Sequence, residues 1–200
     1  MTPNPEALPP VVLASGSAIR LDLLRRAGLT VIADPAGIDE GSLKEKSRRD
    51  NAKTPIAAAT LAAEKAKVVA ARHPEAIVVG ADQILDLDGT WFEKPADMEA
   101  AAEQLRALSG REHSLVSGLA VVKAGQPAWC GAETAWLTMR QLSDDFIDWY
   151  LAAAGPAVLG SVGVYQLEGL GVQLFEKIEG DYFTILGLPL LTLFSHLRGR

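Results

Sequence analysis

The sequence predicts an α/β fold, in which strands and helices alternate along the chain. Short apolar runs typical of buried strands alternate with segments of helical periodicity. Capping and turn residues separate these segments, and no repeat of fixed length relates them. Of the 200 residues, 48% are hydrophobic, and charges are spread along the whole chain. This suits one domain, or two small lobes sharing a core, over residues 11–200, after a flexible, Pro-rich segment, residues 1–10.

The first predicted elements are a buried strand and a helix joined by a polar loop. Residues 11–14 are apolar, and the tight loop Ser15-Gly16-Ser17 follows them. The hydroxyl of Ser17 can accept a hydrogen bond from a free amide of the next helical turn. Gly28 suits the position just after the end of such a helix. The opening unit is therefore expected to be strand, Gly/Ser loop, helix.

The middle of the chain is expected to contain a mobile loop, a helix and a second buried strand. Residues 30–38 are predicted to be extended, and the polar and charged residues 41–53 to form a mobile loop. A helix is predicted over residues 54–72, because Thr followed by Pro is typical of a helix start. Residues 77–81 are apolar and indicate a buried strand, with Asp82 at or just past its end.

The rest of the chain continues the alternation of helices and strands, and Asp88-Gly89 predicts a tight turn. Asp97 and Ser143 are expected to cap helices, and glycines and prolines are expected to end the segments. The predicted elements are helix 97–108, strands 115–122 and 132–139, helix 144–154, a bent or hairpin segment 162–179, and a last helix beginning at Pro189.

Charge and cysteine content exclude several classes of function. The net charge of −6 argues against a broad basic face for nucleic acid polymers. Cys130 is the only cysteine, so the chain forms no intramolecular disulfide. The N-terminal residues lack the features of a signal peptide, and no apolar run is long enough to span a bilayer. A cytoplasmic protein without membrane partners is expected.

The first candidate for chemistry is the Gly/Ser loop that opens the first helix. Such a loop exposes several backbone amides, and the helix dipole adds positive potential, which favours phosphate binding. Arg20, in the first turn, can clamp the same anion. A plain strand-to-helix turn with a capping serine explains the pattern as well, and both interpretations stay open at this point.

The second candidate is the pair Asp82-Gln83, which follows a buried strand where open α/β sheets place their ligands. A carboxylate there can hold a divalent cation or take a proton from water. The alternative is an aspartate that caps the following turn. Gln83 offers both a donor and an acceptor, which suits the reading of a base edge.

Three further charged residues are weaker candidates. Glu40 can add a second metal-facing carboxylate, while Lys65 lies on an Ala-rich helix and Lys94 precedes a proline. Each is also explained as an ordinary solvated charge. The three histidines show no metal-ligand spacing, so the sequence predicts neither a zinc site nor a Ser-His-Asp arrangement.

An ordered series of short motifs resembles the Maf family. No single motif is decisive, but the ordered set is specific and covers nearly the whole chain. The motifs are Leu13-Ala14-Ser15-Gly16-Ser17-Ala18-Ile19-Arg20, Asp39-Glu40, Glu64-Lys65-Ala66, Gly80-Ala81-Asp82-Gln83, Glu93-Lys94-Pro95, Leu108-Ser109-Gly110, Glu168-Gly169-Leu170-Gly171, Gly180-Asp181-Tyr182 and Gly187-Leu188-Pro189-Leu190.

Two positions depart from the family pattern. Ala18 stands where the family usually has Pro, and Leu21 stands where a second Arg is common. One charge facing the phosphates is therefore missing, or Arg25 or Arg26 supplies it.

The resemblance implies an elongated mixed sheet flanked by helices, with two lobes and a deep central cleft, as in inosine triphosphate pyrophosphatases. It implies a house-cleaning hydrolase that acts on phosphorus anhydrides. Such an enzyme splits a nucleoside triphosphate between the α and β phosphates, giving the monophosphate and pyrophosphate. Magnesium or manganese is the expected cofactor, and a homodimer is the expected assembly.

The resemblance also assigns roles to single residues. Asp82 matches the family's proton-accepting aspartate and, with Glu40, its metal ligands. The expected contacts to the substrate come from four further residues, Ser15, Arg20, Lys65 and Lys94.

Base specificity is linked in the family to the positions that Ile19, Gln83 and Glu168 occupy here. Gln83 with Glu168 resembles the branch that acts on 7-methyl-GTP, whereas the branch that acts on dTTP and UTP tends to carry other residues at these two positions.

A different class of function is a nucleotide-binding regulator of cell division, in which hydrolysis is incidental.

Overall fold

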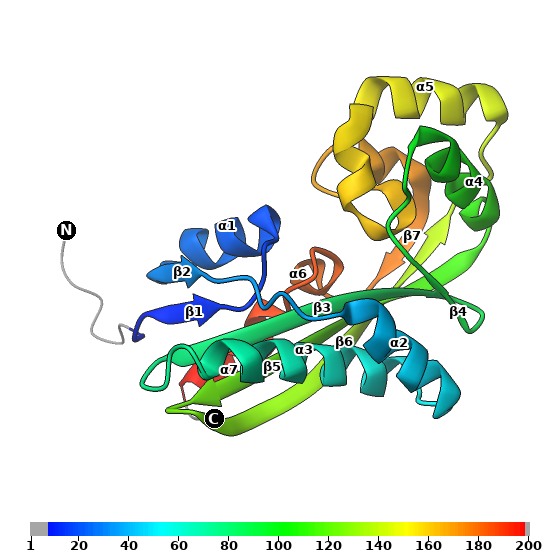
Figure 1. Ribbon diagram of the computed structural model, residues 1–200. Helices are drawn as coiled ribbons and strands as arrows, with labels where there is room; N and C mark the ends of the chain where they lie inside the picture. Colours follow the sequence, from blue (N-terminus) through cyan, green and yellow to red (C-terminus); the bar gives the residue numbers. More distant parts are fainter. Residues whose placement is uncertain (1–7, 199–200) are drawn as a thin grey trace. The chain divides into compact units, whose positions relative to one another are not determined.

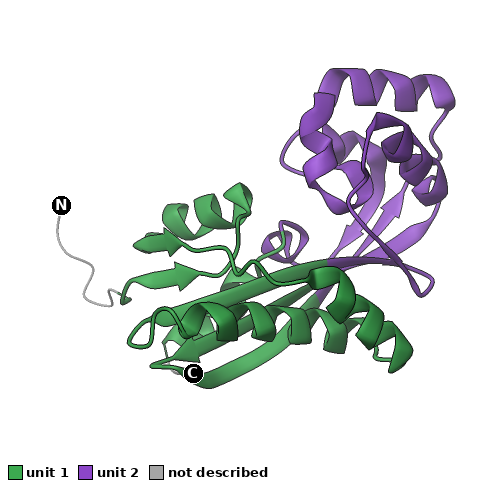
Figure 2. Cartoon of the chain, in the orientation of Figure 1, with its two compact units in different colours: residues 1–83, 117–133, 187–200 green, residues 84–116, 134–186 purple. Residues whose placement is uncertain are grey.

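The computed structural model describes residues 8–198, and its elements are arranged around one mixed sheet (Figure 1). Most of the expected flexible segment, residues 1–7, lies outside the described residues. Within the described part the chain divides into two compact units (Figure 2). Of the described residues, unit 1 comprises 8–83, 117–133 and 187–198, and unit 2 comprises 84–116 and 134–186.

The sheet has seven strands in the order β2-β1-β3-β5-β6-β7, with β4 paired to β3. The first strand runs parallel to both of its neighbours, whereas β3 with β4 and β6 with β7 are antiparallel. The predicted α/β fold with a mixed sheet is thereby confirmed, while the cleft between two lobes stays a prediction. The strands are β1 (Val11–Leu13), β2 (Val31–Ala33), β3 (Ile77–Leu87), β4 (Thr90–Phe92), β5 (Glu112–Lys123), β6 (Gln126–Met139) and β7 (Phe175–Glu179).

Helices cover the sheet within each unit. Unit 1 contains α1 (Ala18–Arg26), α2 (Glu40–Arg49), α3 (Thr54–Ala70) and α7 (Leu190–Leu197). Unit 2 contains α4 (Met98–Leu108), α5 (Asp144–Ala154), the 3₁₀ turns η1 (Gly155–Gly160), η2 (Val162–Val164) and η3 (Leu170–Leu174), and α6 (Tyr182–Ile185). Over residues 8–198, no helix combines the length and the apolar character needed to cross a membrane.

The predicted helix caps are confirmed at three helix starts. Ser17, Asp97 and Ser143 each accept a hydrogen bond from the backbone amide three residues later, and so begin α1, α4 and α5. Gly28 and Gly155 follow α1 and α5 with positive φ angles of 86° and 68°, which suit glycine. These boundaries could be predicted because each depends on side chains within a few residues of the helix end.

The prediction of a mobile loop over residues 41–53 is wrong, because α2 occupies most of it. The side chain of Asp39 caps this helix, with its Oδ1 accepting from the amide of Ser42 at 3.0 Å. Lys46, Arg48 and Arg49 lie in the last turn, where positive charge complements the helix dipole. A helix of this polarity lacks the apolar stripe that reveals most helices in a sequence.

Residues 162–179 were expected to be bent or to form a hairpin, and the hairpin alternative is wrong. The 3₁₀ turns η2 and η3 occupy part of the segment, and its only strand is β7, which pairs with β6. Gly163 adopts a φ angle of 77° inside η2, which interrupts any extended run.

The helix α3 lies unusually close to the sheet in unit 1, because small residues face each other across the contact. A methyl group built on Gly80 of β3 would lie 2.1 Å from the carbonyl oxygen of Ala62. One built on Gly118 of β5 would lie 2.0 Å from the carbonyl oxygen of Ala58. Only glycine therefore allows this approach, which brings the next turn of α3 close to β3.

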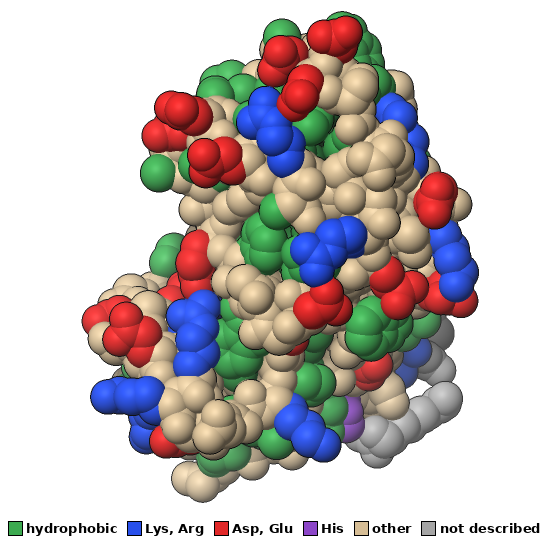
Figure 3. All heavy atoms as spheres, turned by 90° about the vertical axis from the view of Figure 1, so that its right-hand side faces the viewer, with side chains coloured by type: hydrophobic (Ala, Val, Ile, Leu, Met, Phe, Trp, Pro, Cys, Tyr) green, Lys and Arg blue, Asp and Glu red, His purple; other side chains and the backbone are tan. Residues whose placement is uncertain are grey.

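Acidic and basic side chains are interspersed on the face of the molecule drawn in Figure 3.

In unit 2, a separate core forms between the sheet and α4, α5 and the 3₁₀ turns, with Leu105, Leu137 and Tyr150 among its buried members. Each unit is therefore built on its own apolar interior.

Candidate active site

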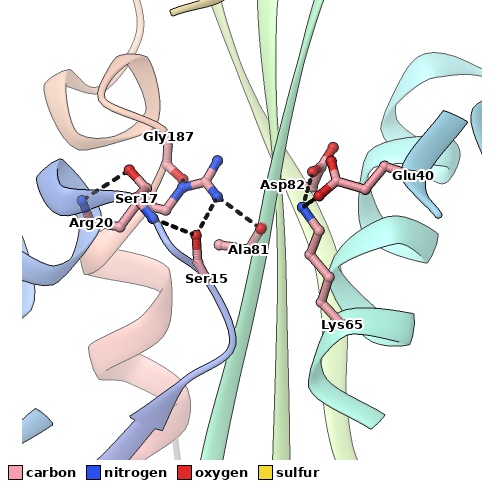
Figure 4. A network of polar contacts seen from close by, with 8 residues as sticks. All are labelled: Ser15, Ser17, Arg20, Glu40, Lys65, Ala81, Asp82 and Gly187. Carbon is pink, nitrogen blue, oxygen red and sulfur yellow. Dashed lines mark hydrogen bonds and ion pairs between the residues drawn. The ribbon is translucent and has the colours of Figure 1, made fainter. Parts of the chain in front are cut away.

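Asp82 lies in the middle of β3, because this strand continues to Leu87. The expectation that Asp82 stands at or past the strand end is wrong. Its side chain points toward α3 and is buried, with only 4% of the residue exposed (Figure 4). A buried carboxylate within a strand requires a charged or hydrogen-bonding partner.

Lys65 of α3 is that partner. Its Nζ donates to Oδ1 of Asp82 at 2.5 Å and lies 2.8 Å from Oε1 of Glu40 (Figure 4). Lys65 is itself buried, whereas Glu40 begins α2 and keeps about half of its side chain exposed. One ammonium group thus joins two carboxyl groups, and the three residues come from α3, β3 and α2.

The surrounding cations set the ionisation of Glu40. Partial burial acts to raise the pKa of Glu40, whereas the hydrogen bond and charge of Lys65 lower it. Lys44 and Arg20 lower this pKa further, so its net value lies below the ordinary range of a glutamate. Glu40 therefore keeps its negative charge at neutral pH.

The second carboxyl oxygen of Asp82, Oδ2, is buried and has no hydrogen-bond partner among residues 8–198. An orphaned carboxyl oxygen beside a second carboxylate is a donor set that fits magnesium or manganese. Within the described residues, no three Asp, Glu, His or Cys side chains gather into a metal site. A cation held by Asp82 and Glu40 would therefore complete its coordination with water and phosphate oxygens, as magnesium commonly does.

Arg20 forms the second half of the site. Its Nη1 donates to Oγ of Ser15 at 3.1 Å and to the carbonyl oxygen of Ala81 at 2.9 Å. Its Nε donates to the carbonyl oxygen of Gly187 at 2.8 Å (Figure 4). Three contacts from three parts of the chain hold the guanidinium in one orientation.

The two halves are close enough to interact electrostatically. Burial lowers the pKa of Arg20, while the charges of Asp82 and Glu40 raise it in part. The carbonyl of Ala81 binds Arg20, and the side chain of the next residue, Asp82, binds Lys65. A guanidinium held in place beside a buried carboxylate is suited to binding an anion next to a proton acceptor.

The structure thus brings together five of the predicted site residues within unit 1, namely Ser15, Arg20, Glu40, Lys65 and Asp82. Two predicted specificity residues, Ile19 on α1 and Gln83 on β3, are half-buried in the same unit. Gln83 donates through Nε2 to Oγ of Ser117 at 3.1 Å.

Two other predicted residues belong to unit 2. Lys94 lies between β4 and α4, and Glu168 lies between η2 and η3. Both are exposed. Their roles at the site stay predictions.

Sequence reasoning missed two residues of this region. Lys44 is buried to 6% exposure on α2, inside the segment that was expected to be a loop. Ser117 is fully buried on β5. A lone serine within the apolar run of residues 115–122 was the one available signal for Ser117.

Comparison with known proteins gives a consistent result. The family described as Maf-like protein matches residues 10–200. A protein of Paramagnetospirillum magneticum named nucleoside triphosphate pyrophosphatase is 50% identical over 187 residues, covering 94% of this chain and 96% of that protein. A 7-methyl-GTP pyrophosphatase of Rhizobium meliloti is also 50% identical, covering 95% and 96%.

Among solved structures, a nucleoside-triphosphatase, or dITP/XTP pyrophosphatase, of Mycobacterium abscessus is similar with a TM-score of 0.49 and 14% identity. The match covers 95% of this chain and 94% of the other.

Proposed function

Because the chain belongs to the Maf-like protein family, we propose that it is a nucleoside triphosphate pyrophosphatase, a hydrolase acting on phosphorus anhydrides. It splits the bond between the α and β phosphates and releases a nucleoside monophosphate and pyrophosphate. The observation that carries this proposal is the buried carboxyl group of Asp82, held by Lys65 beside the fixed guanidinium of Arg20.

Arg20 and the loop before α1 bind the phosphates. The guanidinium is already oriented by Ser15, Ala81 and Gly187, so little side-chain entropy is lost when an anion binds. The amides at the start of α1 add positive potential. Lys94 adds a further positive charge in this proposal.

Asp82 is the group that takes the proton from the attacking water. A carboxylate has about four lone-pair sites and Lys65 occupies one of them on Oδ1, so Asp82 can accept that proton and still hold a metal. Lys65 fixes the orientation of the carboxyl group and opposes the negative charge that builds on the phosphate oxygens. Asp82 and Glu40 would hold the magnesium or manganese ion, which neutralises phosphate charge when bound.

The proposed substrate is a guanine nucleotide of the 7-methyl-GTP kind. Several relatives about half identical to this chain are named 7-methyl-GTP pyrophosphatase. Gln83 lies one residue after Asp82, and Glu168 supplies a second polar group for a base edge in this proposal. The proposal includes a cytoplasmic location, where such nucleotides occur, and a homodimer.

The test is a product analysis with purified protein and magnesium, manganese or a chelator. The substrates are 7-methyl-GTP, GTP, dTTP and UTP. The expected products are pyrophosphate and the monophosphate, formed only with a divalent metal and fastest from 7-methyl-GTP. Release of orthophosphate and a diphosphate would contradict the reaction, and equal turnover of dTTP or UTP would contradict the proposed base.

A further inference from the structure

Ser117 makes a buried hydrogen bond to the side chain of Gln83, from the neighbouring strand of the sheet. Nε2 of Gln83 donates to Oγ of Ser117 at 3.1 Å. Ser117 is fully buried, whereas Gln83 is only half-buried, so one end of the amide is enclosed.

The backbone around Ser117 is held in place from the opposite face of the sheet. The next residue, Gly118, packs against the backbone of α3 so closely that no other side chain fits. Because successive residues of a strand face opposite sides, Ser117 points away from α3. The same alternation places Gln83 opposite to Asp82, and therefore on the same side as Ser117.

Oε1 of Gln83 and the guanidinium of Arg20 both lie next to Gly187. A methyl group built on Gly187 would lie 3.5 Å from Oε1 of Gln83 and 3.2 Å from Nη2 of Arg20. A serine hydroxyl alone accepts either end of an amide, because it can both donate and accept. The positive charge of Arg20 favours one of these two amide orientations, because it attracts the carbonyl oxygen and repels the amide hydrogens.

We propose that Ser117 is a positioning residue that holds Gln83 with its carbonyl oxygen toward the bound nucleotide. The held amide then favours a base that presents hydrogen-bond donors at this point. Guanine presents two adjacent donors on its Watson–Crick edge, whereas uracil presents one. This inference rests on the proposed function and adds to it the residue that orients the base-reading side chain.

A purely structural serine would behave differently. Replacement of a buried serine by alanine changes the free energy of unfolding, but it leaves the preference among bases as it was. A positioning serine acts only through Gln83, so its effect on that preference vanishes once Gln83 is removed.

The experiment measures binding by calorimetry, with magnesium and the α,β-methylene analogues of GTP and UTP. The variants of the full chain are Ser117→Ala, Ser117→Thr, Gln83→Ala and the double variant Ser117→Ala with Gln83→Ala. Ser114→Ala is the matched control, because Ser114 is a buried serine on the same strand. Thermal unfolding of each variant establishes that it is folded.

Ser117→Ala is expected to lower the ratio of GTP-analogue to UTP-analogue affinity by about tenfold, the loss of one oriented hydrogen bond. Ser117→Thr keeps the hydroxyl and restores the ratio, and Ser114→Ala leaves it unchanged. In the Gln83→Ala background, Ser117→Ala is expected to change nothing further.

An unchanged ratio in Ser117→Ala, or an equal fall in the Gln83→Ala background, overturns the inference while leaving the pyrophosphatase proposal in place. A wild-type protein that binds neither analogue overturns both.

Discussion

Lys65 Nζ lies 2.5 Å from Oδ1 of Asp82, although one residue belongs to a helix and the other to the middle of a strand. The contact is buried on both sides. It depends on the close approach of α3 to β3 that Gly80 permits. Packing between the helix and the sheet therefore determines the geometry of the proposed catalytic carboxyl group.

Replacement of Lys65 by methionine is expected to lower both stability and activity. The change keeps an unbranched side chain, one atom shorter, but removes the ammonium group that pairs with the buried carboxyl group of Asp82. Removing one partner of a buried ion pair typically costs about 3–5 kcal/mol. We expect a loss of this order in the free energy of unfolding in urea, and at least a hundredfold fall in kcat for pyrophosphate release. Lys67→Met, on the exposed side of the same helix, is expected to change neither quantity.

Replacement of Gly80 by alanine is expected to damage the site without touching any proposed catalytic group. The added methyl group would overlap the carbonyl oxygen of Ala62, so α3 must move away from β3. Overpacking of this kind typically costs about 1–3 kcal/mol. The shift separates Lys65 from Asp82, so pyrophosphate release is expected to fall in a protein that still folds.

Gly160→Ala is the control for this effect, because a methyl group there meets no atom within 4 Å. Full activity in Gly80→Ala would show that the closeness of α3 to the sheet does not matter to the site.

Replacement of Arg20 by lysine keeps the positive charge but removes the planar guanidinium group with its several N–H donors. A single ammonium group cannot reproduce the contacts to Ser15, Ala81 and Gly187 at once. We expect KM for the triphosphate to rise by about tenfold or more, because the cation is no longer oriented before binding. Steady-state kinetics check this. Arg26→Lys, at an exposed position of the same helix, is expected to leave KM unchanged. An equal rise of KM in Arg26→Lys would contradict the proposal that Arg20 binds the phosphates.

His113 is expected to make stability depend on pH between about 4 and 6.5. Burial lowers the pKa of His113 to about 4, from an ordinary value of 6.5. The unfolded chain therefore binds more protons in this range, and stability falls as the pH decreases through it. The full difference corresponds to about 3 kcal/mol. Above pH 6.5 the group is neutral in both states and the contribution is complete.

Urea unfolding at several pH values measures this effect. His113→Gln offers a side-chain amide to Tyr165, the hydrogen-bond partner of His113 in the folded state. The variant is expected to lose the part of the pH dependence that comes from this residue. A wild-type slope that survives in the variant would assign the effect to other groups.

The sequence allowed the local features of the fold to be predicted. Ser17, Asp97 and Ser143 could be recognised as caps because a cap involves only the next three residues. The helix α2 could not be recognised, because its exposed polar side chains leave no apolar stripe. Its cap, Asp39, was visible in the sequence but was interpreted only as part of a motif.

The composition of the site was predicted better than its geometry. Asp82, Lys65 and Arg20 were identified from motifs, and the structure brings them together. The position of Asp82 within a strand could not be predicted, because an aspartate there is unfavourable unless a distant residue neutralises it. The contact of Gln83 with Ser117 could not be predicted either, because it depends on the pairing of β3 with β5, two strands that are far apart in the sequence.

The most direct test of the account compares pyrophosphate release by the wild type and by Asp82→Asn, at saturating nucleotide and magnesium. Asparagine keeps the shape of the side chain but cannot accept the proton of the attacking water. The account predicts that kcat falls by at least about a hundredfold, a typical size for the loss of a general base, while the variant still binds an α,β-methylene analogue. A variant that binds this analogue and releases pyrophosphate at the wild-type rate would contradict it.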